Sequence, residues 1–150
     1  MVEIERKFLV KKYFHNELEK YEPKQIIQAY LANEKSRSVR IRLMNEKAFL
    51  TIKSAMTGIT RHEFEYEIPK TDAVSLIQSF NLKTLTKKRY CLEFHSKTWE
   101  IDVFEGGLEG LVLAEIELTN EDEEFDIPDW VDEEVTFDPN YLNACLINRL

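Results

Sequence analysis

The sequence predicts an α+β protein that is mainly β: an eight-stranded antiparallel β-barrel with a few helices packed outside it. Apolar and charged residues alternate with a period of two along much of the chain, which is typical of strands. The charged positions within a strand tend to carry one sign, which favours a closed barrel over an open sheet. Glycine and proline number only four each among 150 residues, which excludes a collagen-like or linker-dominated chain.

A chain of 150 residues can bury a core of its own, and we expect a single domain over residues 1–150. No apolar run approaches the roughly 20 residues that cross a bilayer. The first ten residues also lack the apolar block of a secretory signal. The two cysteines, Cys91 and Cys145, are too few for a disulfide framework and indicate a reducing compartment. We therefore expect a cytoplasmic protein with no membrane partner.

Eight segments show the alternation expected of strands. In the first, residues 2–10, Glu3, Glu5 and Lys7 share one face. The charged stretch 44–48 is typical of a hairpin loop between the third and fourth strands. The other predicted strands are residues 25–31, 39–43, 49–53, 61–68, 84–94, 99–105 and 111–118.

Three helical segments are predicted from apolar spacing and capping residues. Residues 72–80 place four apolar side chains on one face of a helix. Thr119 or Asn120 can cap an acidic helical turn that ends before Pro128. Residues 139–150 carry leucines at a spacing of four, which predicts a terminal helix.

The net charge of −8 is unevenly distributed along the chain. Residues 109–138 contain thirteen acidic residues and no Lys or Arg. Duplex binding depends on many phosphate contacts from an exposed basic face, so we expect no nucleic-acid partner. The acidic stretch is either a solvated surface or a source of metal ligands.

The charged faces of the strands bear on the choice between an open sheet and a barrel. Arg40 and Arg42 share one face of their strand, whereas Glu63 and Glu65 share one face of theirs. An ordinary sheet with its charged face in water is one explanation. Like charges two residues apart repel, however, and few uncharged polar residues separate them. A closed barrel with these faces inward would bring oppositely charged strands together.

A lumen that holds both signs of charge favours a particular ligand. Grouped carboxylates suit a hard cation such as Mg²⁺ or Mn²⁺. Grouped Lys and Arg side chains suit phosphate, and Arg can bind two oxygens at once. Eight strands leave room for one small ligand. The predicted lumen therefore suits a polyphosphate that carries its metal, and it suits a lipid poorly.

The order of the charged motifs resembles that of a known family. The chain begins with an E-x-E-x-K motif that spans Glu3 to Lys7. Over about residues 1–145 the chain resembles the CYTH superfamily of triphosphate tunnel metalloenzymes, and most of all its short bacterial members. The later motifs are Gln28-Ala29-Tyr30-Leu31, Arg40-x-Arg42, Thr51-Ile52-Lys53, Glu63-Phe64-Glu65, Lys87-x-Arg89, Glu100-Ile101-Asp102 and Glu115-Ile116-Glu117.

This resemblance implies an eight-stranded tunnel and a role for each charged motif. Tyr30 stands where the short bacterial members have a tyrosine assigned as proton acceptor, although an ordinary tyrosine titrates near pH 10. Glu5 is implied both as a metal ligand and as a catalytic residue, in a reaction where a second metal, or a carboxylate, readies the attacking water. The implied triphosphate-binding residues are Lys7, Arg40, Arg42, Lys53, Lys87 and Arg89. The implied metal ligands are Glu3, Glu5, Asp102, Glu115 and Glu117, with Glu63 and Glu65 in support.

The activity implied by the resemblance is metal-dependent hydrolysis of the terminal phosphoanhydride of a small triphosphate, above all inorganic tripolyphosphate, with Mg or Mn as cofactor. A class IV-type adenylate cyclase and a nucleoside or thiamine triphosphatase are alternatives of the same enzyme class. A polyphosphate or nucleotide binding module is the alternative outside the enzymes. An exposed hairpin or the acidic face could also serve a homodimer.

Overall fold

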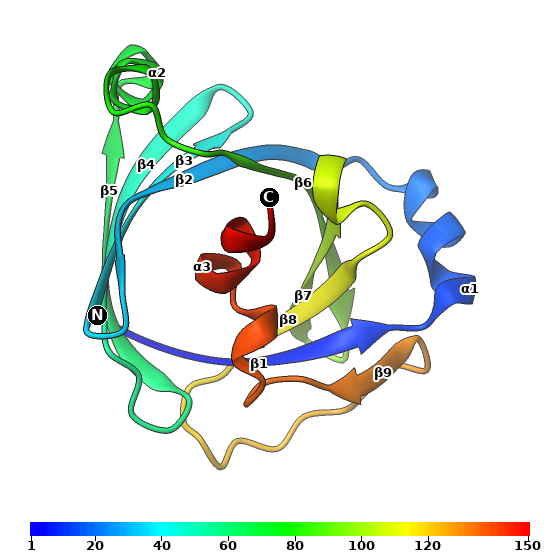
Figure 1. Cartoon of the computed structure of the whole chain (residues 1–150). Coiled ribbons are helices and arrows are strands. Elements are labelled where there is room, and N and C mark those ends of the chain that lie inside the picture. The colour runs from blue at the N-terminus through cyan, green and yellow to red at the C-terminus, as the bar shows by residue number, and fades with distance from the viewer.

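Eight antiparallel strands close into a barrel in the computed structural model, which describes residues 1–150 (Figure 1). The order around the barrel is β1-β5-β4-β3-β2-β6-β7-β8, and β8 returns to β1. The ring closes on β1, because residues 2–4 of β1 pair with β5 and residues 5–9 pair with β8. The strands are β1 (Val2–Val10), β2 (Lys24–Glu34), β3 (Arg37–Met44), β4 (Lys47–Ser54), β5 (Thr60–Ile68), β6 (Leu85–Phe94), β7 (Lys97–Phe104) and β8 (Val112–Glu117).

The period-two pattern divides each strand between the lumen and the outside of the barrel. A core of aromatic and aliphatic residues lies on the outer side of β1, β6, β7 and β8. Trp99 is its fully buried centre, with ring centroids 5.6 Å from Phe8 and 5.5 Å from Trp130. Two peripheral segments cover this core: helix α1 (Lys12–His15) with the 3-10 helix Asn16–Lys20, and the chain that leads into β9 (Val131–Glu134). The charged residues are thereby left to the lumen.

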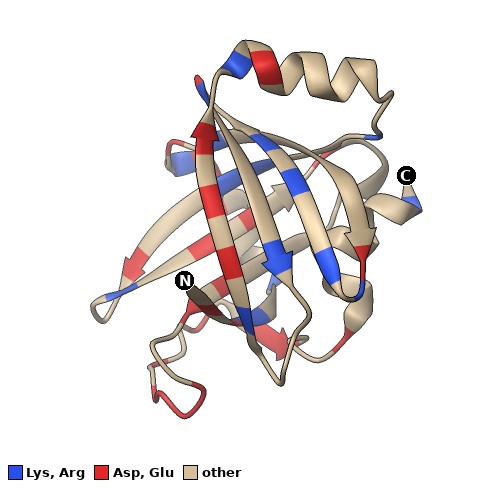
Figure 2. Ribbon diagram, turned by 90° about the vertical axis from the view of Figure 1, so that its left-hand side faces the viewer, with Lys and Arg blue, Asp and Glu red and all other residues tan.

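Helix α2 (Lys70–Ser79) packs outside the barrel, as the sequence predicts (Figure 1). Its Ala73 is fully buried against Ile41 of β3 and Ala48 of β4. In the side view of Figure 2, α2 lies across one end of the strands, and charged bands run along the strands below it. No helix of the structure is both long enough and apolar enough to span a membrane.

The end of the chain closes one end of the barrel. Viewed along the barrel axis, the segment with helix α3 (Asn143–Leu146) lies inside the ring of strands (Figure 1). Leu146 and Ile147 pack against Leu85, Phe104 and Leu113, which come from β6, β7 and β8. The barrel is therefore filled by apolar side chains at this end and by charged side chains further along.

The terminal segment differs from the single helix predicted over residues 139–150. It forms the 3-10 helix Pro139–Tyr141, then α3, then the 3-10 helix Ile147–Arg149, with an extended residue at Leu142. The break has a tertiary cause. The backbone oxygen of Tyr141 accepts a hydrogen bond from Lys7 at 3.0 Å, and the side-chain oxygen of Asn143 accepts one from Lys87 at 3.1 Å.

The acidic segment between Thr119 and Pro128 is not helical, so that prediction is wrong. Its carboxylates bind groups of the neighbouring strands and loop rather than the amides of a helical turn. Glu121 accepts hydrogen bonds from the Ile59 amide at 3.1 Å and the Thr60 hydroxyl at 2.9 Å. Glu123 pairs with Lys97 instead. The eight predicted strands are confirmed with small shifts of their ends, whereas α1 and β9 were not predicted.

Candidate functional site

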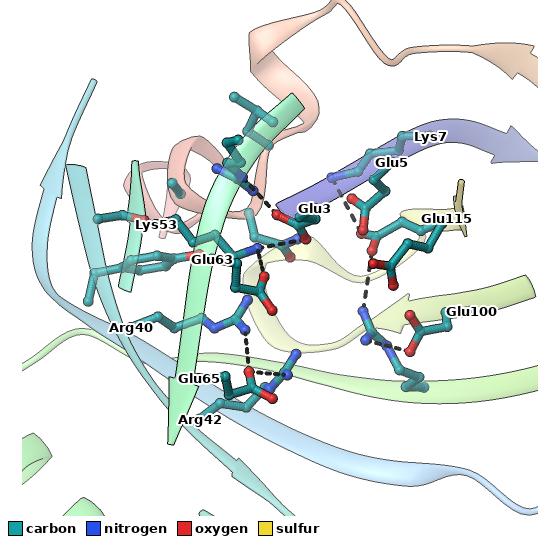
Figure 3. A pocket seen from close by; sticks show the side chains of 18 residues that line it. Glu3, Glu5, Lys7, Arg40, Arg42, Lys53, Glu63, Glu65, Glu100 and Glu115 are labelled. Atoms are coloured by element: carbon teal, nitrogen blue, oxygen red, sulfur yellow. Dashed lines mark hydrogen bonds and ion pairs between the residues drawn. The ribbon is translucent and has the colours of Figure 1, made fainter. Parts of the chain in front are cut away.

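A polar cavity of about 230 Å³ occupies the lumen, and only three of its 18 lining residues are hydrophobic (Figure 3). Seven of the eight barrel strands contribute a charged side chain to it, and the eighth, β2, contributes a tyrosine. The lining comprises Glu3, Glu5, Lys7, Tyr30, Ser38, Arg40, Arg42, Lys53, Arg61, Glu63, Glu65, Arg89, Glu100, Glu115, Glu117, Leu142, Asn143 and Ala144.

One side of the cavity is basic. We call it the cationic wall: Arg40 and Arg42 on β3 and Lys53 on β4. The two arginines share one counter-ion, because a carboxylate oxygen of Glu65 lies 3.6 Å from Arg40 and 3.2 Å from Arg42. Burial and the positive charges of Arg40 and Arg89 lower the pKa of Arg42 to about 10. Two arginines of the cationic wall therefore depend on a single carboxylate, Glu65.

The opposite side of the cavity is acidic. We call it the acidic wall: Glu5 on β1 with Glu115 and Glu117 on β8. In the ring of eight strands, β8 is four strands from β3 in either direction, so the two walls face each other. Figure 3 shows the labelled Arg40 and Arg42 across the cavity from Glu5 and Glu115.

The carboxylates of the acidic wall perturb one another. Burial and the negative charges of Glu115 and Glu3 raise the pKa of Glu5 well above 4.5. Burial would raise the pKa of Glu115 too, but the charges of Lys7 and Arg89 outweigh it and hold that pKa well below 4.5. Glu5 therefore tends to keep its proton beside an ionised Glu115.

A second group of ion pairs lies around Glu3. This carboxylate accepts hydrogen bonds from Lys53 at 2.9 Å and from Arg61 at 2.8 Å. Burial would raise the pKa of Glu3, but the charges of Lys53 and Arg61 lower it to about 2. Lys53 also lies 3.2 Å from Glu63. Before Glu3 can bind a metal, it must therefore give up contacts with two cations.

Two of the residues expected at the site do not line the cavity. Lys87 and Asp102 are 1% and 0% exposed and lie deeper in the barrel than the cavity. We call these two residues the buried floor. Lys87 donates to Asp102 at 2.6 Å, and Arg89 donates to both oxygens of Asp102 at 2.7 and 2.8 Å. Burial lowers the pKa of Lys87 to about 8 despite the charge of Asp102. Arg89 connects the two regions, because it also lines the cavity and lies 3.5 Å from Glu115.

Tyr30 lines the cavity from β2 as a Cα partner of Arg40. Burial raises the pKa of its phenol, although the charges of Arg40, Lys7, Arg61 and Arg42 oppose that rise. The phenol is therefore protonated at neutral pH in this tunnel. This protonation state suits a hydrogen-bond donor better than a proton acceptor.

Several lining residues were not among the predicted site residues. Arg61 is the most important, because it holds Glu3, and Glu100 pairs with Arg89 at 2.8 Å. Both could have been found by extending the alternation of their own strands, since Arg61 precedes Glu63 by two residues and Glu100 precedes Asp102 by two. Asn143 could not, because its place depends on how the terminal segment breaks.

The acidic wall has the donor chemistry of a divalent-cation site. Glu5 and Glu115 are neighbouring carboxylates, and the buried Oε1 of Glu115 has no hydrogen-bond partner. Carboxylate oxygens are the ligands that Mg²⁺ and Mn²⁺ prefer. No three acidic, His or Cys side chains are already gathered around one point, so the carboxylates must leave their ion pairs to complete such a site.

A family model for the CYTH domain matches residues 1–143. The chain belongs to the CYTH family. An inorganic triphosphatase of Acetivibrio thermocellus is 44% identical, and the alignment covers 98% of this chain and 94% of that protein. An inorganic triphosphatase of Nitrosomonas europaea is 36% identical over 97% of both chains. A crystal structure of an inorganic triphosphatase has 32% identity and a TM-score of 0.66, with coverage of 97% of this chain and 93% of that one.

Proposed function

We propose that this CYTH protein is a divalent-metal-dependent hydrolase that cleaves the terminal phosphoanhydride of inorganic tripolyphosphate. The single observation that carries the proposal is the pair of oppositely charged walls that face each other across one cavity. A polyanion alone would suit only the cationic wall, and a metal ion alone would suit only the acidic wall. A triphosphate with its metal satisfies both at once, so their binding should be mutually favourable.

The cationic wall would bind the phosphate chain. Arg40 and Arg42 have planar forks that match phosphate oxygens, whereas Lys53 acts as a point charge. Lys7 and Arg89 would approach from the acidic side, where both lie 3.4–3.5 Å from Glu115. Lys87 lies under the cavity rather than in it, so its proposed part is to position Arg89 through Asp102.

The acidic wall would hold the metal through Glu5 and Glu115, with Glu117 and Glu3 completing the oxygen set. When bound, the metal supplies charge neutralisation and a polarised phosphate or water oxygen. Asp102 was expected among these ligands, but both its oxygens are hydrogen-bonded to cations of the floor. We therefore leave it out of the proposed metal set.

Hydrolysis itself needs little covalent chemistry from the protein. Water attacks the terminal phosphorus, the bond to the bridging oxygen breaks, and orthophosphate and pyrophosphate leave. The cations hold the three phosphates and offset the charge that gathers on the leaving oxygen. We propose that Glu5, ionised beside the bound metal, takes the proton of the attacking water. Tyr30 would donate a hydrogen bond to a phosphate oxygen.

The cavity also favours an inorganic substrate over a nucleotide or thiamine triphosphate. Its hydrophobic lining residues are Tyr30, Leu142 and Ala144, which offer little surface on which a ring could stack. Sites for organic ligands are mostly apolar with a few polar groups, and this cavity is the reverse. The names of the two curated relatives agree with this choice.

The decisive experiment measures phosphate release from tripolyphosphate, ATP and thiamine triphosphate with Mg²⁺, with Mn²⁺ and with chelator. We expect fast, chelator-sensitive release from tripolyphosphate, and its loss in Glu115→Gln. Glu133→Gln, an exposed acid of β9, is the matched control. No turnover by folded protein would overturn the proposal. Cyclic AMP formed from ATP would indicate a cyclase, and binding without turnover would indicate a binding module.

Four wider expectations belong to the same proposal. The chain would act as one domain over residues 1–150, in the cytoplasm, where its two free cysteines stay reduced. A homodimer stays a prediction, which sedimentation would test. The partner of the enzyme is its small triphosphate, with no nucleic acid or membrane required.

A further inference from the structure

One buried side chain of the lumen, Gln28, makes no hydrogen bond in this structure. Gln28 of β2 is on the same strand face as Tyr30, two residues away, and is 0% exposed. Neither its amide nitrogen nor its amide oxygen has a hydrogen-bond partner. Burying an amide without a partner destabilises a fold, and an apolar side chain of similar volume would avoid that penalty. The position therefore retains an amide for something other than packing.

The complementary group is directly opposite. Gln28 and Arg42 are Cα partners in the β2–β3 pair, and side chains so placed have Cβ atoms about 4.5–5.5 Å apart. The Nε–H of Arg42 is also buried without a partner. Its guanidinium is drawn the other way, because Nη2 donates to Glu65 at 3.2 Å. An unused acceptor and an unused donor thus sit across one strand pair.

We infer that Gln28 is a positioning residue for Arg42: when a phosphate displaces Glu65, the amide oxygen of Gln28 accepts the Nε–H of Arg42 and fixes the guanidinium fork. Both Nη groups are then free to bind phosphate oxygens. The inference rests on the proposed function, since it needs a polyphosphate in the tunnel. Leu85, the Cα partner of Gln28 on β6, provides the apolar backing of the site.

The choice of glutamine follows from charge. A glutamate at this position would also accept the Nε–H, but its negative charge would compete with the phosphate for Arg42. An amide orients the guanidinium and leaves its positive charge for the ligand. Gln28→Glu is therefore expected to weaken tripolyphosphate binding more than a neutral substitution does.

The test uses Gln28→Met, which keeps the length of the side chain and removes its polar atoms. We expect Tm of the ligand-free protein to rise by about 2–6 °C, because an unsatisfied buried amide is gone. We expect the affinity for tripolyphosphate, measured by calorimetry with chelator present, to fall about 10- to 100-fold. Gln25→Met, on the exposed start of the same strand, should leave the affinity unchanged. A purely structural role predicts the opposite pair: a lower Tm and an unchanged affinity.

A double-mutant cycle tests whether Gln28 acts through Arg42. In an Arg42→Lys background there is no Nε–H to fix, so Gln28→Met should cause no further loss of affinity. An equal loss in both backgrounds would overturn the inference. Wild-type protein that does not bind tripolyphosphate either with chelator or with Mg²⁺ would instead overturn the proposed function. Binding by wild type and Gln28→Met alike would overturn only the inference.

Discussion

The lumen contains two charged regions with the same kinds of residue and opposite behaviour. In the cavity, Arg40 and Arg42 share Glu65 at 3.6 and 3.2 Å, and the Glu65 side chain is 28% exposed. In the floor, Lys87 and Asp102 form a 2.6 Å contact and are essentially inaccessible. The first arrangement can be exchanged for a ligand, because water and the cavity are adjacent. The second cannot, because both partners would be left buried and unpaired.

The difference shows that a charged lumen is not a uniform binding surface. Ion pairs next to the cavity neutralise the charged groups that line it, and under the proposed function substrate and metal would replace them. The ion pairs of the floor hold the shape of the site from below. Arg89 belongs to both regions, since it binds Asp102 twice at 2.7–2.8 Å and Glu115 more loosely at 3.5 Å.

The largest expected effect, on the free energy of unfolding, comes from removing the central carboxylate of the floor. Asp102→Ala leaves two buried cations, Lys87 and Arg89, without their main counter-ion. Losing one partner of a buried pair costs about 3–5 kcal/mol, so we expect a fall of that size in the free energy of unfolding. Denaturant titration measures it. Glu100→Gln, at the partly exposed partner of Arg89, should cost under about 1 kcal/mol. Equal losses in the two variants would remove the distinction between floor and cavity.

The second largest effect comes from a substitution in the cationic wall, which should lower activity and leave stability nearly unchanged. Arg42→Ala removes one phosphate-binding fork, for which we expect a loss of about 10²–10³ in kcat/KM for tripolyphosphate. Its unfolding free energy should change little, because the wild-type guanidinium is buried among other positive charges. Arg37→Ala, at the exposed start of the same strand, is the matched control. If Arg42→Ala were inactive and lost as much stability as Asp102→Ala, Arg42 would belong functionally with the floor.

The sequence reveals which face of a strand meets the lumen but not how deep each residue lies. Lys87 and Arg89 share a face of β6, as Glu100 and Asp102 share a face of β7, and the alternation treats each pair alike. Two residues along a strand span about 6.6 Å, enough to separate the floor from the cavity. The depth depends on where Leu85, Phe104 and the terminal segment fill the barrel, which is a property of tertiary packing. The alternation of side chains made the barrel and its lumenal faces predictable. It carries no information on depth, so it could not separate the floor from the cavity.

The third effect concerns proton binding by the acidic wall. The folded-state pKa of Glu5 is raised, so between its ordinary 4.5 and the raised value the folded protein holds a proton that the unfolded chain has lost. Metal-free stability therefore falls as pH rises through this window, by about 1.4 kcal/mol per unit of pKa shift. Thermal unfolding against pH measures this dependence, and Glu5→Gln should flatten it.

Metal should change this pH dependence in a defined direction. A divalent cation needs the ionised form of Glu5, so its affinity should increase with pH across the same window. Titration of Mg²⁺ at several pH values checks this, with Glu5→Gln as the variant that loses the dependence. An unchanged slope in Glu5→Gln would show that another group of the acidic wall holds the proton.

The smallest expected effect distinguishes Glu5, the proposed proton acceptor, from Tyr30, the proton acceptor that the sequence resemblance implies. Tyr30→Phe keeps the ring in place and removes only the hydroxyl, whose raised pKa disfavours the phenolate. We expect a loss of less than about tenfold in kcat, as for one hydrogen bond, with no change in the pH–rate profile. Glu5→Gln should instead remove the limb of the profile that reports the proton acceptor. If Tyr30→Phe abolishes that limb, Tyr30 rather than Glu5 is the base. The two profiles, measured side by side on tripolyphosphate, therefore distinguish a hydroxyl that orients a phosphate from one that accepts a proton.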